Sequence, residues 1–144
     1  MDISLLKEMS IQRGSVFRME LFPQDGVTPK NPGDTSRNKY FVVLGADQGK
    51  VLVGSLLINT EINISKIHVI APYQHCIYPE TYDFLMDKYR YVDCYLIKEL
   101  PYERIMETAE YIGLINEDDM IKIINLTKTS PANKPYILRK YDVK

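Results

Sequence analysis

Two side chains of this sequence are of the types that act together on a phosphodiester, an arginine and a hydroxyl. Arg37 ends a polar loop and leads into an apolar strand, and Ser55 lies on the next strand. A hairpin returns residues before and after its turn to register, so we expect Arg37 and Ser55 in one region. The guanidinium would stabilise charge on phosphate oxygens, and the hydroxyl would hold the scissile group. From the residues alone, a solvated arginine and a serine packed in a strand are the alternative.

Other basic residues lie in the loops next to this hairpin. Lys39 follows Arg37, and Arg13 and Lys30 lie in the loops before it. The chain carries 18 basic and 19 acidic residues, a formal charge of -1, which excludes a polybasic protein. Any binding of nucleic acid therefore has to come from a local patch of cations.

Tyrosine is the most unusual feature of the composition. Such rings can stack on nucleobases or anchor a protein interface. They can equally cover the half-buried edge of a small barrel, so both interpretations stay open. Of the 11 tyrosines, one stretch of the chain holds Tyr73, Tyr78, Tyr82, Tyr89, Tyr91 and Tyr95.

Common motifs of enzymes and metal sites are absent from the sequence. It has no Gly-x-x-x-x-Gly-Lys phosphate loop, no Gly-x-Gly-x-x-Gly turn, no His-Glu-x-x-His pair and no Gly-x-Ser-x-Gly elbow. Cys76 and Cys94 lack the spacing of a zinc site, and we expect buried free thiols in a reducing cytosol. His68 and His75 are expected to be surface or hydrogen-bonding histidines. With no apolar run near the ~20 residues of a membrane span and no signal-peptide core, we expect a cytoplasmic protein without metal or cofactor.

The elements that must position these residues are mostly strands. Residues 2–9 suit a short helix or an ordered arm, and residues 23–38 form a long polar loop. Gly54 interrupts a strand, which indicates a bulge or a close backbone approach. The expected strands cover residues 16–22, 40–44, 51–58, 67–70 and 89–97.

The last third of the chain has a helical pattern. Apolar residues repeat at helical spacing from Pro101, and Gly113 is a natural stop. Asn116 is a good N-cap for a second helix. Strands followed by helices predict an α+β, mainly β fold, a small antiparallel barrel with two C-terminal helices. The expected single domain, 1–144, divides into a barrel at about 11–98, helices at about 101–127 and a tail at 128–144.

Five segments follow one another in an order typical of a known toxin family. They are Arg13 to Phe17, Arg37 with residues 40–44, Val51 to Ser55, Phe84 to Cys94 and Asn116 to Leu126. The first resembles the Arg-Gly-Asp-Val/Ile-aromatic opening of the MazF/PemK family. The others are similar to its arginine before an apolar strand, its strand ending in a hydroxyl residue, its late strand and its acidic-capped helix. The resemblance covers roughly residues 11–127.

The resemblance implies both a fold and an activity. Members of the family form SH3-like barrels that dimerise and cut single-stranded RNA as metal-independent endoribonucleases, and a protein antitoxin is a possible partner. Carried over, Arg37 takes the role of the family's arginine and Ser55 that of its hydroxyl residue, with Thr60 as the other candidate. The residues expected to bind RNA are Arg13, Lys30, Lys39, Thr60 and His75.

The sequence also departs from the family pattern. Asn38 follows Arg37 where the family usually has proline, and residues 72–83 and 133–144 are atypical. The departures support an alternative, a non-catalytic barrel module that binds a protein partner or RNA through its tyrosine-rich surface. Binding of a protein would be almost independent of salt, whereas binding of RNA would weaken steeply as salt rises.

Overall fold

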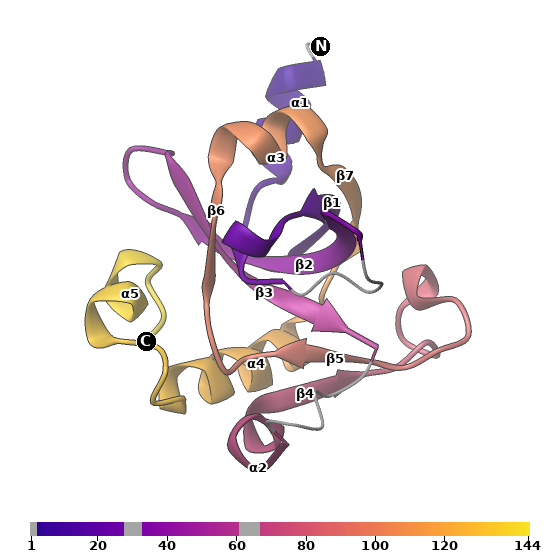
Figure 1. Ribbon diagram of the computed structural model, residues 1–144, viewed down its shortest axis with the longest axis vertical. Coiled ribbons are helices and arrows are strands. Elements are labelled where there is room, and N and C mark those ends of the chain that lie inside the picture. Colours follow the sequence, from indigo (N-terminus) through magenta and orange to yellow (C-terminus); the bar gives the residue numbers. More distant parts are fainter. Residues whose placement is uncertain (1–2, 28–32, 61–66) are drawn as a thin grey trace.

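One antiparallel sheet of seven strands, curled into a half-barrel, makes up most of the described chain, residues 3–27, 33–60 and 67–144 of the computed structural model (Figure 1). The predicted class, α+β and mainly β, is confirmed. The strands are β1 (Ser15–Leu21), β2 (Arg37–Ala46), β3 (Leu52–Asn59), β4 (Gln74–Ile77), β5 (Arg90–Asp93), β6 (Lys98–Pro101) and β7 (Glu110–Leu114). Their order is β4-β5-β3-β2-β1-β7, and β6 also pairs with β3.

Short helices surround the sheet. In Figure 1, α1 and α3 lie at one end of the molecule, and α2 and α4 lie at the other. The helices are α1 (Ile3–Ser10), α2 (Ile67–Ile70), α3 (Tyr102–Thr108), α4 (Glu117–Thr129) and α5 (Pro135–Lys140), with 3-10 turns at Pro23–Asp25, Ala71–Tyr73 and Asp83–Leu85.

Alternation along the strands supplies two apolar clusters, one on each face of the sheet. Phe17 lies opposite Phe41, and both pack with Ile105 of α3 in one cluster. Val42 packs with Ile123 of α4 in the other. The expected hairpin of β2 and β3 is confirmed and forms the centre of both clusters.

The C-terminal segment, expected as a tail at 128–144, packs into the core of the domain. The Tyr141 ring is buried against Gly54, where an added Cβ would lie 2.5 Å from the Tyr141 Cγ. This confirms the expected close approach at Gly54, and β2 also carries a register shift beside it. The Tyr141 hydroxyl donates a hydrogen bond of 2.7 Å to Glu99 on β6. The segment packs because its aromatic ring fills a space that a side chain at position 54 would occupy.

Three element predictions differ from the structure. Residues 67–70 are helix α2, because Ile67 and Val69 are exposed and their apolar alternation faces no core. The helix expected up to Gly113 ends at Thr108, and the residues after it form β7, which pairs with β1. The edge of β1 offers N–H and C=O groups that need partners. Residues 110–114 supply these partners as a strand, which they could not do as a further helical turn. The strand expected at 89–97 is only β5, and β6 follows as a separate strand.

The helices of the described residues are all too short or too polar to cross a membrane.

Candidate functional site

A polar pocket lies at the end of the sheet where β1 and β3 finish and β2 and β5 begin. Its volume is about 230 Å³. Four of its lining side chains are cationic and none of those in the described chain is a carboxylate, so the pocket attracts anions. Arginine is suited to the planar, bidentate recognition of phosphate. The lining residues are Arg18, Arg37, Asn38, Lys39, Tyr40, Ile58, Thr60 and Arg90.

Strand register sets two arginines around the ring of Tyr40. Arg18 lies opposite Tyr40, and Tyr40 lies opposite Ile58, so three neighbouring strands contribute to one face. The guanidinium carbon of Arg90 lies 4.9 Å from the centroid of the Tyr40 ring, which is a cation–π contact. The Arg90 Nε is buried and has no hydrogen-bond partner in the described part of the chain. A buried N–H without an acceptor costs free energy.

Lys39 is a buried lysine in the wall of the pocket, with only 7% of its surface exposed. Its Nζ donates a hydrogen bond to the Oδ1 of Asn59. Burial, and then the positive charges of Arg37 and Arg90, lower the pKa of Lys39 to about 8. Lys39 therefore exchanges its proton closer to neutral pH than an exposed lysine does.

Three of the predicted site residues meet at this pocket. Arg37 is the first residue of β2 and pairs with Leu21 at the end of β1. Thr60 directly follows β3 and is exposed. Lys39 lies two residues after Arg37 on the same strand. The structure therefore brings Arg37, Lys39 and Thr60 together at one pocket.

Ser55 lies elsewhere, and the expectation that it shares a cleft with Arg37 is wrong. It pairs with Val43, which lies six positions after Arg37, so the two residues are separated by about 20 Å of strand. Ser55 is fully buried, and its hydroxyl contacts only the carbonyl of Val53, at 3.4 Å, among the described residues. The hairpin register is the cause, because it brings Arg37 to the end of β3, near Thr60.

Arg13 also lies away from the pocket and has a structural role. Its Nε donates to the carbonyl of Leu44 at 2.9 Å, and one terminal nitrogen donates to the carbonyls of Tyr141 and Asp142 at 2.7 and 3.0 Å. These bonds tie the C-terminal segment to β2. Lys30 lies outside the residues that the structure describes.

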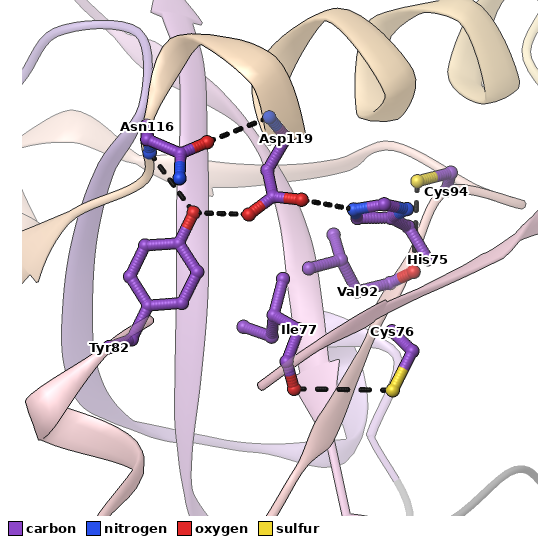
Figure 2. Close-up of polar contacts among 8 residues, drawn as sticks. All are labelled: His75, Cys76, Ile77, Tyr82, Val92, Cys94, Asn116 and Asp119. Atoms are coloured by element: carbon purple, nitrogen blue, oxygen red, sulfur yellow. Dashed lines mark hydrogen bonds and ion pairs between the residues drawn. The ribbon is translucent and has the colours of Figure 1, made fainter. Parts of the chain in front are cut away.

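His75 belongs to a polar cluster at the start of α4. Figure 2 shows the carboxylate of Asp119 between His75 and Tyr82. The His75 Nε2 lies 2.8 Å from one oxygen of Asp119, and the Tyr82 hydroxyl donates to the other. Burial and this hydrogen bond raise the pKa of Tyr82. Asn116 caps the helix by accepting from the backbone N–H of Asp119 at 2.8 Å. The polar groups of His75, Tyr82, Asn116 and Asp119 are thus linked by hydrogen bonds within the cluster. The cluster joins α4 to β4, and His75 lies apart from the pocket.

The cysteines are free thiols. Cys94 is buried, as expected, and burial raises its pKa to about 12, whereas Cys76 is only half-buried. Within the described ranges, no three His, Cys, Asp or Glu side chains gather in a way that could hold a metal ion.

Arg18 and Arg90 are pocket residues that the sequence reasoning missed. Arg18 carries a usable signal, because it is an exposed, charged position in the alternation of β1. Arg90 begins β5, and only the pairing of Ile58 with Val92 brings it beside β3.

The comparisons with known proteins leave this geometry to be interpreted on its own. The chain matches no protein-family model and has no significant sequence match among curated proteins.

Proposed function

We propose that this protein is an endoribonuclease of the MazF/PemK toxin type, an SH3-like barrel that acts on single-stranded RNA in the cytoplasm. The observation that carries the proposal is the pocket of about 230 Å³ with four cationic side chains in its wall. The guanidinium of Arg90, held over the Tyr40 ring, adds to this positive lining. The site also holds Arg37 and a hydroxyl residue, Thr60, the two types that phosphodiester chemistry needs.

The reaction is a transesterification within the RNA strand. The 2′ oxygen of one nucleotide forms a bond to the adjacent phosphorus while the bond from phosphorus to the 5′ oxygen breaks. The products are a 2′,3′-cyclic phosphate and a free 5′ hydroxyl. Arg37 and Arg90 donate to the non-bridging oxygens, on which negative charge increases. Thr60 replaces Ser55 as the hydroxyl that positions the phosphate.

Lys39 supplies the proton transfer. With its pKa near 8, part of the Lys39 population is a free amine at neutral pH and accepts the proton of the 2′ hydroxyl. The leaving 5′ oxygen takes a proton from water, so the proton count balances. Asn59 holds the Lys39 amine in place by hydrogen bonding.

The direct test is cleavage of a long RNA in buffer that contains EDTA. We expect the purified wild-type protein to cleave, and Arg37→Ala to lose about 100-fold or more of the rate, because one transition-state donor is gone. Expression of the wild type should also inhibit growth, and expression of Arg37→Ala should not.

Arg139→Ala is the matched control. Arg139 is an exposed arginine on α5 and does not line the pocket, so the same change in net charge should leave cleavage intact. Absence of cleavage by the wild type on any long RNA, together with harmless expression, would contradict the enzymatic proposal.

A homodimer and a protein antitoxin belong to the same proposal. Exposed Tyr111 and Leu114 on the edge strand β7 support a surface that a second chain covers.

A further inference from the structure

One face of the sheet connects the pocket with the edge strand β7. Tyr40 on β2 lies opposite Arg18 on β1, and Val16 on β1 lies opposite Gly113 on β7. Opposite residues of antiparallel strands share a face, and so do alternate residues of one strand. Tyr40 and Gly113 therefore lie on the same face, on the two strands that flank β1.

The ring of Phe84 lies over this face and contacts both strands. Its centroid is 6.3 Å from that of the Tyr40 ring. A Cβ added at Gly113 would lie 3.1 Å from the Phe84 Cδ1, which is closer than side chains normally approach. The missing side chain at Gly113 thus leaves room for the Phe84 ring to pack against β7 and Tyr40 together.

Two buried neighbours hold Phe84 in place. It lies in the 3-10 turn Asp83–Leu85, between Tyr82 and Leu85, which are 6% and 2% exposed. The Tyr82 hydroxyl is hydrogen-bonded to the start of α4, and the Tyr82 ring packs against Phe84 with centroids 5.6 Å apart. Because both ends of the turn are anchored, the Phe84 ring cannot leave Tyr40 unless the turn moves.

Arg90 is the pocket residue that depends on this packing. Its guanidinium lies over the Tyr40 ring, and no carboxylate of the described residues pairs with it. The charge of Arg90 helps to lower the pKa of Lys39, so the two cations lie close enough to repel each other. Attraction between the guanidinium and the Tyr40 ring opposes this repulsion and keeps Arg90 at the pocket.

We propose that Phe84 is a positioning residue of the pocket, which holds the Tyr40 ring and through it the guanidinium of Arg90. This inference rests on the proposed function, in which Arg90 donates to the phosphate. Phe84 is not among the residues that line the pocket, so it acts through Tyr40. Misplacing a group at a reacting centre by about 1 Å can cost about 100-fold in rate.

The test is a double-mutant cycle of Phe84→Leu and Arg90→Ala, with kcat and KM for cleavage of one RNA as the readout. We expect Phe84→Leu to lower kcat/KM about 10-fold, because it misplaces a donor to the transition state. In the Arg90→Ala background the same change should have no further effect, since the group that Phe84 positions is gone. A loss of folded protein would instead lower kcat equally in both backgrounds.

Three further variants keep the Phe84 ring. Gly113→Ala adds a methyl group against that ring, and it should lower kcat/KM of the wild type but not of Arg90→Ala. Gly45→Ala, on β2, is the matched control: its added Cβ would lie 3.9 Å from the nearest atom, and it should cleave at the wild-type rate. Tyr40→Phe keeps the ring under Arg90 and should cleave within about twofold of the wild type.

The outcomes separate this inference from the proposed function. If Phe84→Leu cleaves as fast as the wild type, or slows Arg90→Ala by the same factor, Phe84 is not a positioning residue and the proposed function stands. If thermal unfolding shows that Phe84→Leu is not folded, Gly113→Ala decides by the same comparison. If the wild type cleaves no RNA, the proposed function fails and this inference fails with it.

Discussion

Lys39 is a positive charge that the fold keeps away from water and beside two other cations. The lowered pKa means that the folded protein releases this proton at about pH 8, while the unfolded chain keeps it up to the ordinary value of 10.5. Between these values unfolding takes up a proton, so the contribution of Lys39 to stability increases with pH. Below pH 8 both states are protonated and the unfavourable contribution is constant.

We therefore predict that Lys39→Met is more stable than the wild type at pH 7, by up to about 3 kcal/mol. The difference between the two proteins should shrink as the pH rises from 8 to 10. Urea unfolding at several pH values measures it, and taking the difference cancels the titration of other groups. A difference that is constant over this range would show that Lys39 has an ordinary pKa.

Thr60 and Ser55 offer a comparison of two hydroxyls in different places. We predict that Thr60→Val lowers RNA cleavage about 10-fold or more, because it removes a hydroxyl from the pocket at nearly equal volume. Ser55→Ala should retain the wild-type rate, since Ser55 is buried far along the hairpin. Cleavage time courses of the two variants on one RNA measure both effects. A loss of rate in Ser55→Ala with none in Thr60→Val would place the chemistry at Ser55.

At the scale of elements, the β2–β3 hairpin shows how much of the structure can be predicted from the sequence. The two long apolar strands and the close approach at Gly54 can be read from the sequence and agree with the structure. The partner of Ser55 can also be obtained by counting outward from the turn at Asp47, which places Arg37 near Thr60 instead. The site prediction failed at Ser55 because Ser55 lies too near the turn to reach Arg37 at the far end of β2.

Other elements could not be predicted because distant parts of the chain decide them. Residues 110–114 have helical periodicity, yet they form β7 because the edge of β1 is there to pair with. Arg90 reaches the pocket only through the pairing of β5 with β3. The place of Tyr141 depends on Gly54, 87 positions earlier in the chain.

The edge strand β7 carries the prediction that tests dimerisation. Leu114 is an exposed leucine on this edge, and a lysine there blocks strand-to-strand contact. We predict that the wild type sediments as a dimer and that Leu114→Lys sediments as a monomer. Tyr136→Lys, at an exposed position on α5, is the control that should remain dimeric. A monomeric wild type would contradict the proposed homodimer.

At the scale of the whole molecule, the formal charge of -1 conceals a local concentration of cations. If the four pocket cations contact phosphates, the logarithm of RNA affinity should fall with the logarithm of salt concentration with a slope of about −3. Arg18→Ala should reduce that slope by about 0.7. Fluorescence anisotropy at several salt concentrations measures both. A slope near zero would favour the protein-binding module.

The contact of Tyr141 with Gly54 also bears on the order in which the molecule is completed. During synthesis β1, β2, β3 and β6 are all made before residue 141. Until then the space over Gly54 is empty, and Arg13 lacks two of its three carbonyl partners. Closing a contact between such distant positions is slow compared with forming a hairpin. A molecule assembled in this way completes its core only after its central hairpin and β6 have been made.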